Sequence, residues 1–286
     1  MKREFKVVLV ISFAMILLAG TATLGHAFFQ AEDGCLVPYA YYNDSTDTMI
    51  GLISWIETGY FYWSFMSADG VQLGHGSIPA NEAYKIPFSL KNADGNAHPN
   101  QVGYIVFTYD GEDEILQPTE DRAELAANAV LLSAGDAAFI PVVPLTRWDY
   151  ASGNVDLHSL NAGSIVGLSY GYPANEHIST SFWIDPFFGA ETLLVVWCSQ
   201  SPPAVFDAEI YSTDSFDWTE VTFTRYHQVL NVYDMAFDAV GLDPSIVDGI
   251  VDILDGGGER FVFSLISSNA FSAIQTMVGF YQPDML

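Results

Sequence analysis

MIGLISWIETGYFYWSFMSADGVQ, residues Met49–Gln72, decides the fold class of this chain. It contains two runs rich in β-branched and aromatic residues, Met49–Ile56 and Tyr60–Met66, separated by Glu57-Thr58-Gly59. A short gap containing glycine between two such runs predicts a β-hairpin. Asp69-Gly70, just after the second run, predicts a further tight turn.

Short apolar runs alternate with turn signals along the rest of the chain. Many short strands with few helices are typical of an all-β sandwich or barrel. We therefore expect two packed β-sandwich units, Ig-like or jelly-roll-like, at residues 28–146 and 163–286, joined by a polar, turn-rich linker at 147–162. The predicted strands are Cys35–Tyr42, Ala83–Leu90, Gly103–Tyr109, Ala137–Leu145, Ser164–Tyr170, Ile178–Ile184, Thr192–Cys198, Val205–Tyr211, Glu220–Thr224, Val229–Tyr233, Arg260–Ile266 and Ala273–Phe280.

Three segments carry additional signals. Asp121–Leu132 combines an acidic capping pair with several alanines and predicts a short helix. Pro244–Leu254 follows Asp243 as a cap and predicts a second one. Ala137–Leu145 contains two prolines, which predict an edge strand or an extended crossing.

The N-terminus has the three parts of a secretory signal. Lys2 and Arg3 precede the apolar run Val7–Leu18, and the small-residue site Gly25-His26-Ala27 follows. The apolar run is shorter than the roughly 20 residues that span a bilayer. We expect residues 1–27 to be removed and the mature chain, without a membrane span, to be periplasmic, on the cell surface or extracellular; an uncleaved anchor is the alternative.

The charge balance is strongly acidic. The chain has 9 Lys and Arg against 35 Asp and Glu, a net charge of −26. Without the signal, which holds Lys2, Arg3, Lys6 and Glu4, 6 basic and 34 acidic residues remain, and the net charge becomes −28. So few basic residues exclude nucleic acid and anionic membranes as partners, because phosphates would not be neutralised. Solubility outside the cell and cation binding are both consistent with this charge.

Two segments resemble known proteins. Leu36-Val37-Pro38-Tyr39 and Phe139-Ile140-Pro141-Val142-Val143-Pro144-Leu145 are similar to segments of uncharacterised exported bacterial proteins with β-sandwich domains. The resemblance covers a few strands and contains no functional motif. It implies the same fold class and no particular activity.

Gly167-Leu168-Ser169-Tyr170-Gly171 is a formal G-x-S-x-G motif. In α/β-hydrolases this motif exposes a serine nucleophile on a strand-to-helix turn, and the serine needs a histidine as base. Asp207 and His227 would complete such a triad in the right chain order, with Asp185 or Asp217 as other choices for the acid. However, Pro173 and Asn175 predict a turn where the helix should begin. Glycines in a twisted strand and turn explain the motif equally simply.

Few residues are arranged to hold a metal ion. The histidines lack zinc-ligand spacing, and no cofactor is predicted. The acidic loop with Asp110, Glu112, Asp113 and Glu114 would offer hard oxygen ligands to Ca²⁺, although it does not fit an EF-hand loop. Solvated loop charges are the simpler interpretation.

Most aromatic residues lie in predicted strands and are expected in the core. Trp148 and Tyr150 lie in the polar linker and are the candidates for stacking against a glycan. The two cysteines of the exported chain, Cys35 and Cys198, either form one disulfide or are separate thiols, with Cys198 buried at a strand end.

These observations favour an exported, non-enzymatic structural or binding protein with an extracellular protein or glycan as partner. A serine hydrolase using Ser169 and a glycan- or calcium-binding module are the alternatives.

Overall fold

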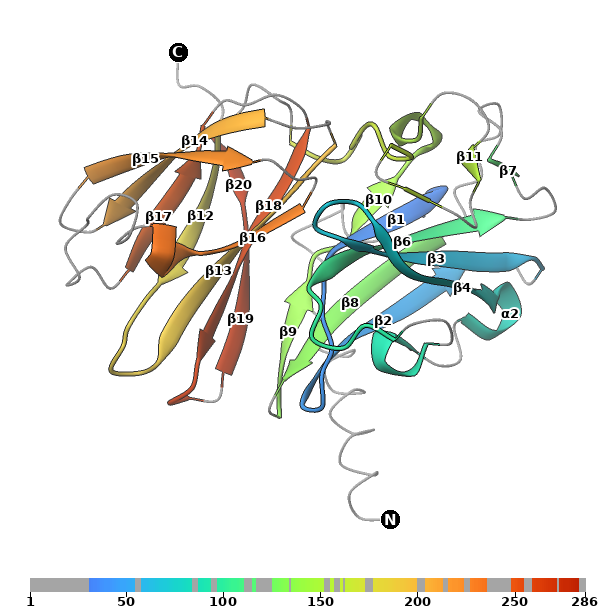
Figure 1. Ribbon diagram of the computed structural model, residues 1–286, viewed down its shortest axis with the longest axis horizontal. Coiled ribbons are helices and arrows are strands. Elements are labelled where there is room, and N and C mark those ends of the chain that lie inside the picture. The colour runs from blue at the N-terminus through green and yellow to red at the C-terminus, as the bar shows by residue number, and fades with distance from the viewer. Residues whose placement is uncertain are drawn as a thin grey trace.

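The computed structural model of the chain is built mainly from β-strands (Figure 1). It describes residues 31–54, 58–83, 87–93, 97–110, 115–116, 125–133, 135–151, 155–156, 160–161, 163–172, 177–199, 204–212, 216–223, 227–235, 248–254, 259–271 and 273–282. The predicted signal peptide, residues 1–27, lies outside these residues.

The N-terminal half of the described chain forms two antiparallel sheets. Sheet I has the strand order β10-β1-β6-β3-β4, and sheet II has the order β5-β2-β8-β9. Their bounds are β1 Gly34–Ala40, β2 Thr46–Ser54, β3 Tyr60–Ser67, β4 Gln72–Pro79, β5 Phe88–Ser89, β6 Gly103–Asp110, β8 Leu125–Ser133, β9 Asp136–Ile140 and β10 Val143–Leu145.

The C-terminal half forms two more antiparallel sheets. Sheet III has the order β16-β13-β18-β19, and sheet IV has the order β15-β14-β17-β12-β20. Their bounds are β12 His177–Trp183, β13 Ala190–Cys198, β14 Ala204–Ser212, β15 Phe216–Phe223, β16 His227–Asn231, β17 Asp248–Ile253, β18 Arg260–Ser268, β19 Ala273–Val278 and β20 Phe280–Gln282.

Helices are few and short. They include α2 at Ala80–Ala83 and the 3₁₀ turns η1 at Leu90–Asn92 and η2 at Arg147–Asp149, and a small separate sheet pairs β7, Ile115–Leu116, with β11, Val155–Asp156. The predicted all-β class with few short helices is therefore confirmed. Within the described residues, no helix combines the length and the apolar character needed to cross a bilayer.

The stretch that decides the fold class does not form the predicted first hairpin. β2 pairs with β5 and β8 in sheet II, whereas β3 pairs with β4 and β6 in sheet I. The chain instead arches between the sheets near Gly59, whose φ of +80° suits glycine. The apolar residues of both strands belong to one core, among them Ile50, Leu52, Phe61 and Phe65. The second predicted turn is correct, since Gly70 (φ +71°) closes a hairpin between β3 and β4.

Both helix predictions are wrong where the structure describes them. The described part of Asp121–Leu132 lies in strand β8, which pairs along its whole length with β2. Local helix propensity is overridden because Leu125, Ala127, Ala129 and Leu131 alternate into the core at 0–4% exposure. The described part of Pro244–Leu254 is mainly β17, held between β12 and β14.

Most predicted strands are present, with two exceptions. Ala83–Leu90 contains the end of α2, the two-residue strand β5 and the start of η1. Ser164–Tyr170 forms turns and one isolated bridge, between Ile165 and Tyr150. The prolines of Ala137–Leu145 act as predicted, because the chain crosses there from β9, an edge of sheet II, to β10, an edge of sheet I.

The central strands of sheet III, β13 and β18, are buried on both faces. Val195, Trp197, Phe261, Phe263 and Leu265 belong to the hydrophobic cluster of the first half. Their neighbours on the opposite face, Leu194, Val196, Cys198 and Val262, pack into the second cluster, against sheet IV.

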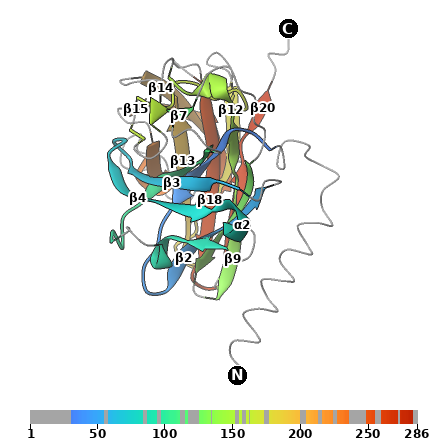
Figure 2. The ribbon, with the colours of Figure 1, turned by 90° about the vertical axis from the view of Figure 1, so that its right-hand side faces the viewer.

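The two halves also meet directly (Figures 1 and 2). Tyr104 of β6 contacts Trp197 of β13 edge-on, with ring centroids 5.8 Å apart. At the other side, β9 faces β19, where Asp136 Oδ2 accepts a hydrogen bond from Ile274 N at 2.8 Å. The predicted linker, residues 147–162, lies between the two halves in the sequence. It contains η2, β11 and the buried residues Asp149 and Tyr150.

Candidate functional site

Asp149 fixes the loop that carries Ser169. The carboxylate is 1% exposed, and its Oδ1 accepts hydrogen bonds from Ser169 N at 2.6 Å and Ser169 Oγ at 2.8 Å. Its Oδ2 accepts from Thr146 N at 2.7 Å and Thr146 Oγ1 at 3.0 Å, which makes a capping box at the start of η2. The same loop is tied to Glu259, whose Oε2 accepts from Leu168 N. Three donors of the G-x-S-x-G segment, Leu168 N, Ser169 N and Ser169 Oγ, are therefore held by two carboxylates, one of which is itself fixed by Thr146.

The segment after Ser169 is not the helix that a hydrolase requires. Ser169 and Tyr170 form a turn, and Tyr172 makes a bridge with Arg260. Ser169 Oγ also lies 3.1 Å from Thr146 Oγ1. Among the described residues its hydroxyl contacts are with a carboxylate and a hydroxyl, and no histidine is hydrogen-bonded to it.

The other two members of the proposed triad lie elsewhere in the fold. Asp207 is exposed on β14, where its carbonyl accepts a hydrogen bond from Leu254 N at 2.8 Å. His227 is fully buried at the start of β16, its ring 5.7 Å from that of Tyr104. Burial lowers the pKa of His227 to about 4, against a smaller opposing effect of the Pro38 backbone, so the imidazole is neutral at pH 7. This histidine packs at the junction of the two halves.

The two predicted stacking residues differ in their surroundings. Tyr150 is 4% exposed, so its ring cannot form a surface platform, and burial raises the pKa of its hydroxyl well above 10. This corrects the prediction for Tyr150. Trp148 is 69% exposed, but the Arg147 guanidinium lies 4.4 Å from its ring centroid and covers one face.

The metal and disulfide predictions have different outcomes. Asp110 is the last residue of β6, while Glu112, Asp113 and Glu114 lie outside the described residues. Within the described part of the chain, no group of three or more His, Cys, Asp and Glu side chains is arranged to hold a metal ion. Cys35 and Cys198 are buried in different hydrophobic clusters and are not joined by a disulfide in the structure.

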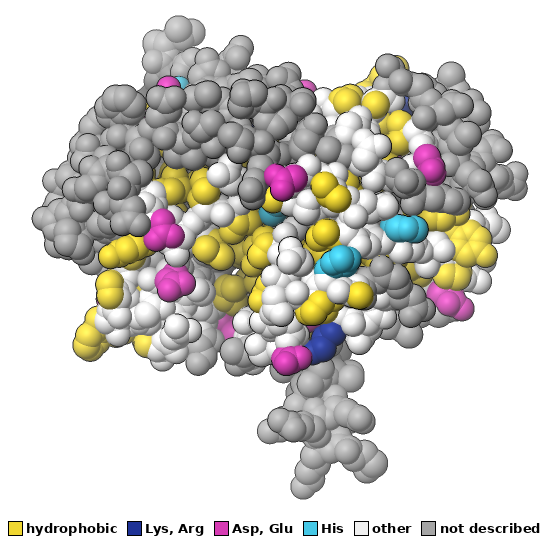
Figure 3. Space-filling view, viewed as in Figure 1, with side chains coloured by type: hydrophobic (Ala, Val, Ile, Leu, Met, Phe, Trp, Pro, Cys, Tyr) yellow, Lys and Arg dark blue, Asp and Glu magenta, His cyan; other side chains and the backbone are white. Residues whose placement is uncertain are grey.

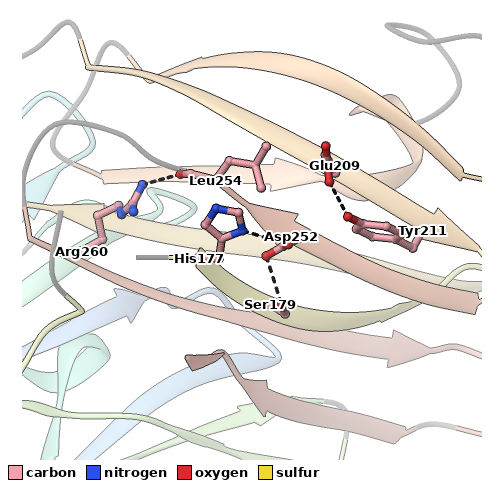
Figure 4. A network of polar contacts seen from close by, with 7 residues as sticks. All are labelled: His177, Ser179, Glu209, Tyr211, Asp252, Leu254 and Arg260. Carbon is pink, nitrogen blue, oxygen red and sulfur yellow. Dashed lines mark hydrogen bonds and ion pairs between the residues drawn. The ribbon is translucent and has the colours of Figure 1, made fainter. Parts of the chain in front are cut away.

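A polar network crosses the outer face of sheet IV (Figure 4). Asp252 of β17 accepts a hydrogen bond from Ser179 Oγ at 3.0 Å and lies 3.5 Å from His177 Nδ1. On the next strand, Glu209 accepts a hydrogen bond from Tyr211. Burial, followed by that bond and the neighbouring carboxylates, raises the pKa of Tyr211 to about 12. The network contains two carboxylates in direct register, Glu209 opposite Asp252.

Four aromatic rings cluster where the connection from β12 to β13 meets the β18–β19 turn, and we call them the aromatic tip. Trp183 is the last residue of β12, Phe187 and Phe188 lie in the connection to β13, and Phe271 comes from the β18–β19 turn. Phe271 stacks on Phe188 at 5.2 Å and on Trp183 at 6.3 Å, with interplanar angles of 29° and 27°. Phe187 meets Phe188 edge-on at 4.9 Å.

The aromatic tip is exposed and held in place. Phe187 is 86% exposed and Phe271 59% exposed, and hydrophobic side chains are visible at the lower left of Figure 3, where the β12–β13 connection and the β18–β19 turn lie in Figure 1. Asp185 Oδ1 accepts hydrogen bonds from Phe187 N at 2.9 Å and Phe188 N at 3.4 Å, which fixes the turn. Exposed aromatic clusters of this kind mark interaction sites.

Sequence reasoning missed most of the aromatic tip. Asp185-Pro186-Phe187-Phe188-Gly189 is a turn sequence with two consecutive phenylalanines, and large apolar residues at a turn cannot all face a core. This turn is therefore recognisable in the sequence. Its contact with Phe271 is not, because that contact depends on β13 pairing with β18.

Comparisons with known proteins give no family for this chain. No family model matches it, and no curated protein matches it. A cryo-EM structure of the arabinofuranosyltransferase AftD from Mycobacteria is similar at a TM-score of 0.19 and 9% identity, over 86% of this chain and 29% of that chain. A TM-score this low carries no argument about fold or function.

Proposed function

We propose that this chain is an exported, non-enzymatic binding protein and that the aromatic tip is its contact surface for an uncharged glycan. The observation that carries the proposal is the exposure of Phe187 and Phe271 in a fixed cluster of rings. Soluble proteins rarely expose several contiguous large aromatic side chains without a partner.

The surroundings of Ser169 support a protein without hydrolase activity. Its hydroxyl is bonded to Asp149, and the described contacts provide it with no imidazole base. A serine without a base is a weak nucleophile at neutral pH.

The chemistry of the aromatic tip favours a neutral ligand. Aromatic rings offer flat apolar faces that match the C–H faces of sugars, and here three rings are inclined to one another by 27–40°. The net charge of −26 for the whole chain disfavours an anionic ligand or an anionic membrane. This assigns the glycan role to residues other than Trp148 and Tyr150.

Affinity gel electrophoresis tests the proposal. Wild-type protein and the double variant Phe187→Ala, Phe271→Ala would be run through gels containing xylan, mannan, β-glucan or galactan. We expect at least one polysaccharide to retard the wild type and not the double variant. Trp148→Ala is the matched control, because it removes an exposed aromatic ring outside the aromatic tip. No retardation of the wild type by any of the four, or equal retardation of the double variant, would contradict the proposal.

Export is tested separately. N-terminal sequencing of the protein recovered outside the cytoplasm should begin at or near Phe28. A mature protein that begins at Met1 would show that the signal is not cleaved.

A further inference from the structure

The second surface of interest is the free edge of sheet I. β4 ends the strand order of this sheet, and no strand of the described chain pairs with its other side. Unpaired edges are templates for added strands, and proteins usually protect them with charge, proline, shortness or a cover.

The other edge strands carry such protection. β5, β10 and β20 have two or three residues, and β10 contains Pro144. β9 and β19 face each other, and β16 begins beside the β3–β4 turn, where His227 N donates to Ala68 O. Of the two eight-residue edges, β15 includes Asp217 and Glu220, whereas β4 has no acidic or basic residue other than His75 and has its one proline at the last position.

The hydrogen-bond pattern shows which groups of β4 are free. Ala80 N donates to Gly59 O at 3.0 Å, one step beyond the Tyr60–Pro79 pair. Because hydrogen-bonded and non-bonded pairs alternate in antiparallel strands, Ile78 and Gly76 direct their N–H and C=O groups toward β3. Ser77 and His75 therefore direct theirs away from the sheet, and both residues are exposed.

A groove lies between this edge and sheet II. Its volume is about 550 Å³, and its lining includes Trp63, Gly76, Phe88, Ser89 and Asn92. β4 presents Gly74 and Gly76 opposite Phe65 and Trp63, so no β4 side chain closes the gap there. A Cβ at Gly76 would lie 2.8 Å from Trp63 Nε1.

We propose that β4 binds an extended peptide segment of a partner protein by strand addition. Ser77 and His75 supply the main-chain hydrogen bonds, and alternate apolar side chains of the peptide enter the groove beside Trp63 and Phe88. The peptide carries basic residues at its ends, because the chain that receives it has a net charge of −26. The same charge disfavours a second copy of this chain as the occupant. This surface is independent of the aromatic tip and of the glycan proposal.

A synthetic probe tests the proposal. The probe is the acetylated and amidated peptide KTVTVTVK, whose alternating valines face one side when it is extended. In a titration followed by ¹H–¹⁵N NMR of the full mature protein, we expect saturable binding and slowed amide exchange at Ser77 and His75, with Gly76 unchanged. Two further peptides test which edge of the probe pairs with β4. One is N-methylated at all valines and the other at all threonines, so each lacks the N–H groups along one edge of the extended peptide. We expect one of the two to bind roughly tenfold more weakly or worse.

Protein variants provide the second arm of the test. Ser77→Pro removes an N–H at the free edge and no hydrogen bond to β3, so the variant should fold. It should bind the probe roughly tenfold more weakly or worse. Ser77→Thr keeps the N–H and should bind the probe like the wild type. Circular dichroism and an unchanged melting temperature verify the fold of both variants. The proposal is overturned if the probe does not bind, if both N-methylated versions bind equally, or if Ser77→Pro binds normally. It is also overturned if sedimentation shows a dimer that Ser77→Pro dissociates, because the occupant is then a second copy.

Discussion

Asp149 Oδ1 accepts both the backbone N–H and the hydroxyl of Ser169, at 2.6 and 2.8 Å. The two residues are 20 positions apart, and the carboxylate joins η2 to the turn that carries the serine. A buried carboxylate that accepts several hydrogen bonds is satisfied without a cationic partner. The G-x-S-x-G sequence is thus part of a fixed polar connection.

Removing this carboxylate should destabilise the fold. Asp149→Ala removes the acceptor of the N–H groups of the half-buried Thr146 and the exposed Ser169, and we expect a loss of about 1–3 kcal/mol in the free energy of unfolding. Ser169→Ala removes one donor and should cost about 1 kcal/mol. Urea unfolding at pH 7.5 measures both, with the exposed Asp44→Ala as control. A fluorophosphonate probe should not label Ser169, and specific labelling there would make the hydrolase the better interpretation.

His227 should make the stability fall on mild acidification. Its folded-state pKa of about 4 lies below the unfolded value of 6.5, so the unfolded chain binds more protons between these values. Its stabilising contribution is present above pH 6.5 and is lost as the pH falls toward 4, by on the order of 3 kcal/mol.

His227→Phe is the variant that isolates this contribution, since an apolar ring fits beside Tyr104 and does not titrate. The measurement is the free energy of unfolding of both proteins at pH 7.5, 6, 5 and 4.5. Repulsion among the 35 carboxylates of the chain acts in the opposite direction in both proteins and cancels in the comparison. Parallel pH profiles would contradict the assignment.

The facing carboxylates of Glu209 and Asp252 should repel each other. Like charges directly opposite on neighbouring strands are destabilising, so Glu209→Gln should stabilise the protein by about 0.2–1 kcal/mol at pH 7.5 and low salt. Glutamine still offers an oxygen to Tyr211. The gain should shrink only slightly in high NaCl, because Asp252 is buried and Glu209 is half-buried, and salt screens such pairs weakly. The exposed Glu191→Gln is the control in thermal unfolding, and a net loss in Glu209→Gln would show that the charge itself is favourable there.

Both thiols should be unreactive in the folded protein. Cys35 is 1% and Cys198 3% exposed, and burial raises the pKa of the Cys35 thiol. Ellman's reagent should therefore detect almost no thiol in native protein and two thiols per chain after unfolding without reductant. Zero thiols after unfolding would show that a disulfide forms.

The sequence predicts the strands better than it predicts their partners. The alternation in Gly103–Asp110 and the turn at Gly70 are local signals, and the structure contains both features. The choice between a hairpin and an arch after β2 depends on which sheet buries Ile50 and Phe61. The sequence of residues 55–59 does not distinguish the two. The alanines of β8 show the same limit, because their small size fits a crowded core as well as it fits a helix.

The candidate sites show this limit more strongly. Trp148 and Tyr150 share one polar segment, yet one is exposed and the other is buried, since Tyr150 lies close to Gly34 of β1. The aromatic tip and the free edge of β4 are both products of pairing between distant strands. The periodicity of a sequence indicates which residues of a strand face the core. It does not indicate which strand lies at the edge of a sheet.

Because the central strands of sheet III are covered on both sides, we expect the two halves of this chain to unfold together. Separating them would bring Trp197, Phe261 and Phe263 into water, and the same three residues belong to the core cluster of the first half. During folding, Tyr104 and its neighbours are therefore covered only once β18, near the end of the chain, is in place. A nascent chain halted at the linker would be an aggregation-prone intermediate, and calorimetry of the full-length protein should record one cooperative transition.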